Sequence, residues 1–289
     1  LGKKNKTKVN SVIKKVKDKG FTILGKNTQD CFGFGTFSTN CQYKIPKNPY
    51  DKQRATGGSS GGTASFIKLS KHVNHGIAQS TGGSINCPAA FCGVVGLTPT
   101  YGLVSRYGLI DYANSFDRIG TITKTIQQTA ELLTIIAGKD EKDQTSQKKN
   151  KDYTKFLKKE TKKRKIAYIK EALEQSDKKV QKQIKLALSD LEKLGYQIEE
   201  ISFPLLEYTV PTYYIIALAE TSTNLAKFCG LRYGKSKQIE GHYNEFFTKV
   251  RTKYFSTEEK RRIMLGTFIR LAGYRDKYYL KAIKIKQML

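Results

Sequence analysis

The stretch TGGSSGGTAS, residues Thr56–Ser65, raises the first structural question about this chain of 289 residues. Its central segment, Gly57–Gly62, holds four glycines and two serines, as expected of a flexible linker, a phosphate-binding loop or part of a catalytic site. A P-loop needs Gly-x4-Gly-Lys-Ser/Thr after a strand, and neither this pattern nor GxGxxG occurs here. A linker would be flanked by polar sequence, whereas this segment runs directly into the apolar residues ASFI. The sequence therefore argues against a phosphate-binding loop and against a flexible linker, and a catalytic site is the interpretation that remains.

A second glycine–serine turn makes the catalytic interpretation concrete. It lies in STGGSINCPAAFCG, residues Ser80–Gly93. A Gly-Gly-Ser turn allows successive backbone N–H groups to point into one concavity, which can bind an oxyanion beside a nucleophilic serine. Such a serine needs a base, but the only histidines are His72, His75 and His242, and none has a local partner pattern. His72 and His75 are more typical of an exposed loop than of a metal site, so we expect no metal.

Composition restricts the class of protein without deciding its function. The net charge is +27, yet only ten of the 52 basic residues are arginine, and the lysines are spread along the chain. This pattern favours a solvated basic surface, while attraction to RNA stays open. Five cysteines without C-x-x-C spacing indicate reduced thiols and a cytoplasmic setting, although an organelle matrix is also compatible. No apolar run approaches the about 20 residues that span a bilayer, so we expect no membrane association.

Hydrophobic periodicity predicts an α/β fold. Helices are expected over residues 11–19, from residue 61 onward and over 125–138, with short strands at Phe21–Leu24 and Gly76–Gln79. Residues 139–164 are polar and charged, which indicates a linker or an exposed loop. A βαβ unit is predicted by the order of a strand (165–169), a helix (178–194) and a second strand (196–201). The chain from Pro211 onward is predicted to be mainly helical. We therefore expect a mixed, mostly parallel sheet flanked by helices.

The two glycine–serine segments together resemble the amidase signature family. Further similar segments cover nearly the whole chain: GKNTQD (Gly25–Asp30), NPYD (Asn48–Asp51), YGLVSRYGLIDYANSFDRIG (Tyr101–Gly120), ETSTNLAKFCGLRYG (Glu220–Gly234) and KRRIMLGTFIRLAGYRDKYYLKA (Lys260–Ala282). The last two resemble one branch, the A subunits of glutamyl-tRNA(Gln)/aspartyl-tRNA(Asn) amidotransferases. The resemblance implies the amidase-signature fold in one domain, residues 1–289, comprising a core (1–138), a charged loop (139–164) and a βαβ and helical part (165–289).

The resemblance assigns roles residue by residue. It implies that Ser84 is the nucleophile and that Ser59, held by a cis peptide bond to Gly58, is the bridging serine. The backbone N–H groups of the turn match the oxyanion hole, which comprises Thr81, Gly82 and Gly83. Tyr274 falls in a substrate-side helix of the family, with core packing as the alternative. Cys87 and Cys92 are expected to be structural thiols, and Arg106 and Asp117 to hold loops.

The same resemblance implies a glutaminase subunit with a Ser–cis-Ser–Lys mechanism. It would hydrolyse glutamine and pass ammonia to a B subunit that uses ATP and Mg to convert Glu-tRNA(Gln) or Asp-tRNA(Asn), with a C subunit completing the complex; this chain itself would need no cofactor. The family's lysine lies in a Lys-Asp-Asn context that this sequence lacks, so we expect a chain truncated at both ends. A general amidase of small amides and an inactive fragment or assembly subunit remain as alternatives.

The chain departs from the family inside the second turn. Where the family reads Asp-Thr-Gly-Gly-Ser-Ile-Arg, this sequence has Ser80 in place of the aspartate and Asn86 in place of the arginine. Losing both charges together is milder than leaving one buried charge unpaired. We expect a hydrogen bond between Ser80 and Asn86 to replace the ion pair.

Overall fold

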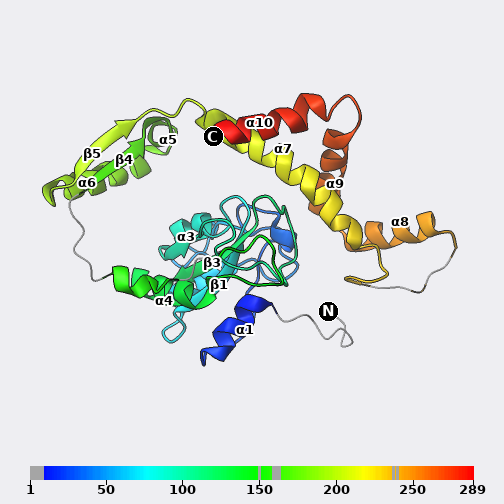
Figure 1. Ribbon diagram of the computed structural model, residues 1–289, viewed down its shortest axis with the longest axis horizontal. Helices are drawn as coiled ribbons and strands as arrows, with labels where there is room; N and C mark the ends of the chain where they lie inside the picture. The colour runs from blue at the N-terminus through cyan, green and yellow to red at the C-terminus, as the bar shows by residue number, and fades with distance from the viewer. Residues whose placement is uncertain (1–9, 149–150, 158–163, 236–237, 239–240) are drawn as a thin grey trace.

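The computed structural model describes residues 10–289 except 149–150, 158–163, 236–237 and 239–240. The elements of its first half are α1 (Ser11–Asp18), α2 (Gly61–Leu69), β1 (His75–Ser80), α3 (Asn86–Cys92), β2 (Val95–Leu97), β3 (Arg118–Thr123) and α4 (Ile126–Ile136). Those of the second half are β4 (Lys165–Ile169), α5 (Lys170–Glu174), α6 (Lys178–Lys193), β5 (Gln197–Ile201), α7 (Leu206–Asn224), α8 (Tyr243–Tyr254), α9 (Thr257–Arg270) and α10 (Lys281–Met288). Figure 1 shows their arrangement.

The core is a three-stranded sheet between two layers of helices. Its order is β1–β3–β2, and β3 is antiparallel to both neighbours. One apolar cluster joins α1 and α4 to the sheet through Val12, Leu132 and Ile119. Another joins α2 and α3 to it through Ile67, Cys92 and Ile122. The predicted α/β class is confirmed, because helices cover both faces of this sheet.

The expectation of mostly parallel pairing is wrong for this sheet. β1 and β2 run parallel to each other with α3 as the crossover between them, as helix–strand alternation predicts. β3, which comes later in the chain, lies between them in the opposite direction. Alternation along the sequence cannot reveal such an insertion. Among the described strands, only β4 and β5 pair in parallel.

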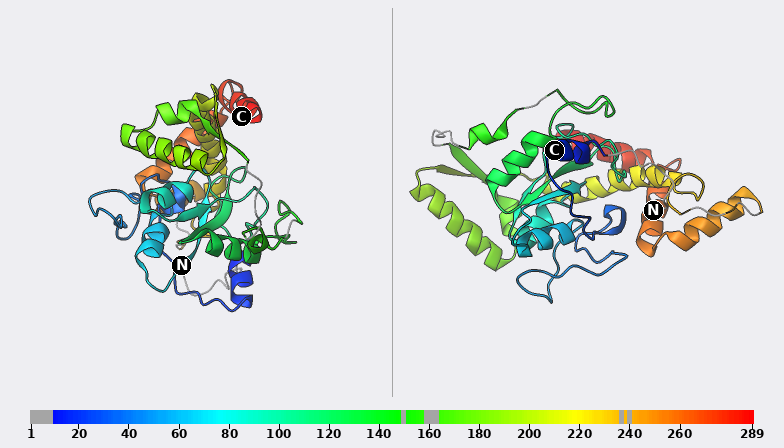
Figure 2. Two further views of the ribbon diagram at one scale, coloured as in Figure 1. Left: turned by 90° about the vertical axis from the view of Figure 1, so that its left-hand side faces the viewer. Right: turned by 90° about the horizontal axis from the view of Figure 1, so that it is seen from below.

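The β4–α6–β5 unit forms as predicted, and its strands pair from Lys165 opposite Gln197 to Ile169 opposite Ile201. It lies at one end of the molecule and α8 at the other (Figures 1 and 2). In contrast to the core helices, α6 has no buried residue.

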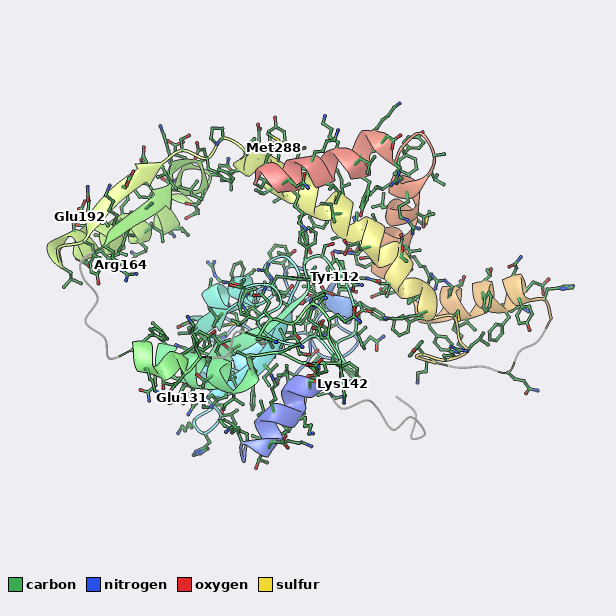
Figure 3. The ribbon with its side chains drawn as sticks, in the orientation of Figure 1. Tyr112, Glu131, Lys142, Arg164, Glu192 and Met288 are labelled. Carbon is green, nitrogen blue, oxygen red and sulfur yellow. The ribbon has the colours of Figure 1, made fainter. Side chains whose placement is uncertain are left out.

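The helices of the last third pack on one another and close one side of the core. α7 begins at Leu206, five residues before the predicted start at Pro211, and contains that proline in its second turn. Gly266 of α9 allows close contact with α7, because a Cβ built there would lie 1.9 Å from the backbone oxygen of Leu218. Phe34 and Tyr112 of the core share a buried cluster with Ala217 of α7, and Figure 3 shows Tyr112 at this junction.

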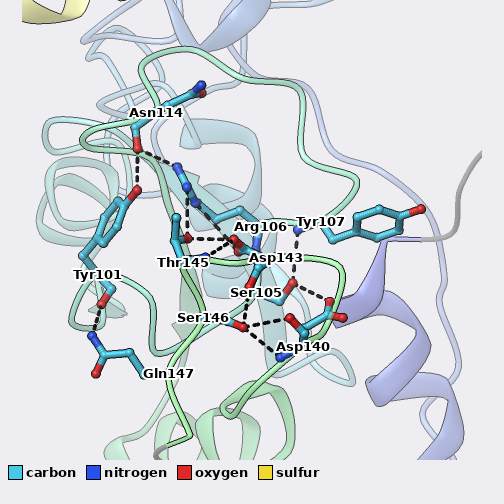
Figure 4. Close-up of polar contacts among 10 residues, drawn as sticks. All are labelled: Tyr101, Ser105, Arg106, Tyr107, Asn114, Asp140, Asp143, Thr145, Ser146 and Gln147. Carbon is cyan, nitrogen blue, oxygen red and sulfur yellow. Dashed lines mark hydrogen bonds and ion pairs between the residues drawn. The ribbon is translucent and has the colours of Figure 1, made fainter.

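Two stretches between the predicted elements have structures of their own. Phe21–Leu24 is not a strand; Leu24 is 71% exposed, and no described strand pairs with this segment. Residues 140–147, which begin the charged stretch, fold back onto the core (Figure 4). The Ser105 hydroxyl donates to Asp140 over 2.6 Å, and the N–H of Arg106 donates to Asp143 over 2.7 Å.

Among the helices that the structure describes, none has both the length and the apolar character needed to cross a membrane.

Candidate active site

The turn between β1 and α3 carries the predicted nucleophile. Ser84 is 8% exposed and lines a cavity of about 80 Å³ together with Gly82 and Gly83. The backbone N–H groups of Thr81, Gly82, Gly83 and Ser84 donate to no acceptor in the part of the chain that the structure describes. The hydroxyl of Thr81, at the start of the turn, donates to Asp117 over 2.6 Å. Free N–H groups beside a serine hydroxyl are the arrangement that an oxyanion hole requires.

Asp117 holds this turn in place through hydrogen bonds of its carboxylate. One of its carboxylate oxygens accepts from Thr81 and from the side-chain amide of Gln79, and the other accepts from the N–H groups of Tyr112 and Ala113. Burial raises the pKa of Asp117, and these hydrogen bonds oppose the rise. Asp117 therefore couples the end of β1 to the loop that carries Tyr112.

The first glycine–serine segment lies directly against this turn. The peptide bond between Gly58 and Ser59 is cis, as the resemblance implied. Ser59 is 1% exposed, and its hydroxyl has no hydrogen-bond partner among the described residues. The next residue ties the two segments together, because the N–H of Ser60 donates to the backbone oxygen of Ser84 over 3.2 Å. The structure thus brings together the two segments that carry the predicted serines.

Asp30 and Ser38 hold the Ser59 segment in place. The N–H of Asp30 donates to the backbone oxygen of Ser59 over 3.2 Å, and the Ser38 hydroxyl donates to that of Gly57 over 2.8 Å. The carboxylate of Asp30 accepts from the N–H groups of Ser38 and Asn40. A Cβ at position 58 would lie 2.5 Å from this carboxylate, which explains why glycine precedes Ser59.

A buried cation lines the same cavity. Arg262 of α9 is 6% exposed, and its guanidinium lies over the ring of Phe34, 4.7 Å from the centroid. Its Nε donates to Glu258 over 2.6 Å and its Nη1 donates to the Tyr112 hydroxyl. Burial opposes the charge of Arg262, but Tyr112 and Glu258 keep its pKa above the ordinary value. Its other N–H groups have no acceptor among the described residues.

Two neighbouring tyrosines complete the wall of the cavity. Tyr213 and Tyr214 of α7 both line it, and the Tyr213 hydroxyl donates to that of Tyr112 over 3.3 Å. Burial raises the pKa of Tyr213, so its hydroxyl stays protonated. The cavity therefore combines a serine hydroxyl, N–H donors without an acceptor among the described residues and a permanent positive charge. Such a set suits attack on a carbonyl of a substrate that also bears an anionic group.

A family model described as Amidase matches residues 2–289. The chain belongs to the amidase family. The A subunit of the glutamyl-tRNA(Gln) amidotransferase of Persephonella marina is 44% identical over 281 residues, which cover 96% of this chain and 58% of that protein. The same subunit of Microcystis aeruginosa is 46% identical with the same coverage. A crystal structure of this subunit from Thermotoga maritima matches with a TM-score of 0.77 at 37% identity, covering 96% of this chain and 56% of that one.

These similarities confirm the predicted family and its fold. This amidase spans a little over half the length of the relatives it matches. No lysine of the described residues lines the cavity around Ser84.

The remaining predicted residues lie in different settings. Tyr274 is 40% exposed, packs on Phe268 with ring centroids 4.3 Å apart and does not line the Ser84 cavity. Cys87 does line that cavity, whereas Cys92 is fully buried and burial raises the pKa of its thiol to about 11. A thiol with such a pKa is a poor nucleophile at neutral pH.

The expected hydrogen bond between Ser80 and Asn86 is not formed. The Ser80 side chain is completely buried and its hydroxyl has no partner among the described residues. The Asn86 amide oxygen instead accepts from the Thr98 hydroxyl over 2.5 Å. Asn86 is the first residue of α3, and its partner Thr98 is the residue that follows β2.

Sequence reasoning missed the residues that α7 and α9 bring to the cavity, Tyr213, Tyr214 and Arg262. These residues are far from the serine segments in sequence, so no local pattern connects them with the site. Only tertiary packing brings α7 and α9 to the turn. The signal available was indirect: Arg262 lies within Lys260–Ala282, one of the segments that carried the family resemblance.

Proposed function

We propose that this chain supplies the nucleophile, bridging serine and oxyanion hole of a glutamine-hydrolysing subunit of a tRNA-dependent amidotransferase. One observation carries the proposal. Ser84 lies in a small cavity beside unpaired backbone N–H groups, and the buried, unpartnered hydroxyl of Ser59 lies in the adjoining segment. The names of the relatives in Persephonella marina and Microcystis aeruginosa support the choice of amidotransferase.

In the proposed reaction, the Ser84 hydroxyl attacks the side-chain amide carbon of glutamine. Its proton passes through the Ser59 hydroxyl to a neutral lysine of a segment outside this sequence. The N–H groups of Thr81, Gly82, Gly83 and Ser84 stabilise the oxyanion. The amide nitrogen takes up a proton and leaves as ammonia, which yields a glutamyl ester on Ser84. Water then hydrolyses the ester to glutamate and restores the serine.

Arg262 supports glutamine over a simple amide as the substrate. Its unpaired N–H groups face a cavity that contains Ser84, and a guanidinium binds a carboxylate through two parallel hydrogen bonds. A carboxylate-bearing amide gains this interaction, whereas acetamide does not. Arg262→Lys should therefore raise KM for glutamine at least about tenfold while changing acetamide hydrolysis little, and equal effects on both substrates would contradict this role of Arg262.

The proposal includes the partners of the complex. The ammonia would pass to a B subunit that activates the misacylated tRNA with ATP and Mg, with a C subunit holding the two together. This chain would need no cofactor of its own. The complex would work where aminoacyl-tRNAs are made, in the cytoplasm or an organelle matrix.

Reconstitution tests the function. The chain is combined with the B and C subunits of Persephonella marina and with the portions of its A subunit that lie outside the matched region. We expect glutamine-dependent ammonia release that Ser84→Ala abolishes. Ser60→Ala is the matched control, because among the described residues the Ser60 hydroxyl donates only to the Gln79 backbone oxygen. This substitution should leave most activity intact.

The alternatives predict different results. A general amidase would release ammonia from small amides without the B and C subunits. An inactive assembly subunit would assemble with them but release no ammonia. Either result, or ammonia release that survives Ser84→Ala, would contradict the proposed function.

A further inference from the structure

Two cysteines lie at the two ends of the loop that supports the Ser59 segment. Cys31 directly follows Asp30, and Cys41 directly follows Asn40. Both are free thiols, and both are half-buried. Neither is among the described residues that line the candidate active-site cavity, and the proposed reaction uses neither of them.

A backbone hydrogen bond brings the two cysteines close together. The N–H of Cys31 donates to the backbone oxygen of Asn40 over 2.8 Å, and that oxygen belongs to the peptide group that joins Asn40 to Cys41. With standard backbone dimensions, the Cα atoms of Cys31 and Cys41 are therefore no more than about 7 Å apart, and closer in any bent arrangement. Disulfides join residues whose Cα atoms are about 4.4–6.8 Å apart, so this pair is within reach of one.

The two thiols also share their surroundings. Burial raises the pKa of both, and the nearby charge of the Asp30 carboxylate adds to the rise in each case. The Cys41 thiol contributes to the raised pKa of Cys31, whereas the backbone N–H of Gln42, the residue after Cys41, opposes it. The sulfur of Cys31 therefore lies near the backbone of Cys41 and Gln42.

Bond formation needs only a small rearrangement of the side chains. The Sγ of Cys41 donates to the backbone oxygen of Ser38 over 3.1 Å. A thiol is a weak hydrogen-bond donor, so little is lost when Cys41 turns to another staggered rotamer. Because the Cα atoms are already within range, the backbone can stay where it is.

We propose that Cys31 and Cys41 are an oxidation site, at which a peroxide converts the two thiols into a disulfide that closes the loop behind Ser59. One thiolate attacks a peroxide oxygen, the O–O bond breaks, and hydroxide leaves while a sulfenic acid remains on that cysteine. The second thiolate attacks the oxidised sulfur, the S–O bond breaks, and hydroxide leaves as the S–S bond forms. The thiol protons neutralise both hydroxides, so two thiols and one hydrogen peroxide give one disulfide and two waters.

The bond would close the loop that holds the backbone around Ser59. The Asp30 carboxylate accepts from the N–H of Ser38 over 3.0 Å, and the Ser38 hydroxyl accepts from the N–H of Gly61 over 3.0 Å. Two residues of the loop other than glycine, Phe32 and Ser38, have left-handed backbone, with φ of 52° and 60°. Surrounding contacts must maintain such a conformation. A cross-link between the ends of the loop restricts its open conformations, so oxidation should stabilise the closed one.

The environment of the thiols predicts how fast the bond forms and breaks. Their raised pKa values keep both protonated near neutral pH, which slows the first reaction with peroxide. The same property makes both thiolates poor leaving groups, so a reducing thiol opens the disulfide slowly. We therefore expect a bond that accumulates during lasting exposure to peroxide and then persists.

Peptide mapping of the full chain after treatment with hydrogen peroxide tests the bond. Residues Asn27–Tyr43 include no lysine or arginine, so trypsin leaves both cysteines in one peptide. We expect this peptide to lose two hydrogen atoms and to resist alkylation until dithiothreitol restores both thiols. Cys229 is also a half-buried free thiol and is the internal reference, which should remain open to alkylation. Unchanged alkylation of Cys31 and Cys41, or a bond from either to another cysteine, overturns the proposal.

Hydrogen exchange tests the effect on the loop. The N–H groups of Asp30 and Gly61 join the loop to the Ser59 segment, and we expect both to exchange at least about tenfold more slowly after oxidation, while β3 amides are unchanged. Cys41→Ser removes one sulfur and should abolish the slowing.

The matched control is Cys229→Ser, which should retain the slowing. Equal slowing in Cys41→Ser, or a disulfide-bonded chain without slowing, contradicts the role of the cross-link.

This inference goes beyond the proposed function and does not rest on it. Ser84→Ala should form the disulfide at the same rate as the unmodified chain and show the same slowing of exchange. Absence of glutamine hydrolysis would therefore leave the disulfide result standing, and the reverse also holds. A disulfide that forms only when the Ser84 hydroxyl is present would contradict the proposed site.

Discussion

Gly57 is the residue of the first glycine–serine segment that combines a left-handed backbone with a close backbone neighbour. Its φ is +70°, and a Cβ built there would lie 2.8 Å from the Cα of Pro88 in α3. Left-handed backbone and overpacking each cost an L-residue about 1–3 kcal/mol. We expect Gly57→Ala to lower the free energy of unfolding by about 2–4 kcal/mol, as measured by urea denaturation.

Gly83, in the second turn, is the matched control for this substitution. Its φ lies outside the left-handed region, and the nearest atom to a built Cβ is 3.9 Å away on Cys87. Gly83→Ala should therefore change the free energy of unfolding by less than about 1 kcal/mol. Similar losses in the two variants would contradict this explanation of why the segments are built from glycine.

At the residue scale, the sequence predicted the part of the candidate site that comes from the two short glycine–serine segments. The Gly-Gly-Ser turn in STGGS indicated a nucleophilic serine at its end, and the family resemblance assigned the roles of Ser84 and Ser59. Sequence did not point to Arg262 or Tyr213, whose positions depend on how α7 and α9 pack. Tyr274 packs on Phe268 and does not line the cavity around Ser84, so its substrate-side role stays a prediction beside the alternative of packing.

At the scale of elements, a buried carboxylate fixes the loop that follows α4 (Figure 4). Asp143 accepts from the N–H of Arg106 over 2.7 Å and from the N–H and hydroxyl of Thr145 over 3.0 and 2.7 Å. Burial opposes its ionisation, but these hydrogen bonds prevail and lower the pKa of Asp143 below its ordinary 3.8. Asp143 thus stabilises the folded state in its charged form.

The pH dependence follows from the direction of this shift. Because the folded pKa is below the unfolded one, the contribution of Asp143 is complete above about pH 4 and is lost as pH falls through the folded pKa. Asp143→Asn should lower the free energy of unfolding by about 1–3 kcal/mol at pH 7 and by clearly less at pH 2.5. Urea denaturation at the two pH values measures the difference.

Asp18 provides the comparison, because it is exposed in the last turn of α1. Asp18→Asn should leave stability nearly unchanged at both pH values. A loss in Asp143→Asn that is the same at pH 7 and pH 2.5 would show that the carboxylate does not act through its charge.

Elements were predictable wherever the pattern was local. The helices at 11–18, 126–136 and 178–193 and the strands at 75–80, 165–169 and 197–201 follow their periodicity closely. Strand direction was not predictable, because β3 enters the sheet between β1 and β2 only in three dimensions. Phe21–Leu24 has strand-like residues but no partner strand in the described structure, and a strand needs cross-strand pairs to form.

At the scale of the whole molecule, the two sheets should differ in stability. β3 is buried along almost its whole length, with Ile122 0% exposed, whereas β5 is mostly exposed and α6 buries no residue. Local stability follows the apolar surface buried around each hydrogen bond. We expect amides of β4 and β5 to exchange at least about 100-fold faster than those of β3, as measured by hydrogen exchange and mass spectrometry.

The exposed helix α6 serves as the internal reference for that experiment. Its amides should exchange at rates close to those of β4 and β5, since all three belong to one weakly buried unit. Equal protection of β3 and β5 would mean that the second unit is stabilised by contacts beyond those of the described residues.

The proposed function depends on Ser84 being the nucleophile of an amide-hydrolysing site. The most direct measurement is acid quenching of the reconstituted enzyme during glutamine turnover, followed by mass spectrometry of its peptides. We predict a glutamyl ester on the peptide that contains Ser84, absent from Ser84→Ala and retained in Ser60→Ala. A glutamyl adduct on Cys87, or turnover that proceeds unchanged in Ser84→Ala, would contradict this role of Ser84.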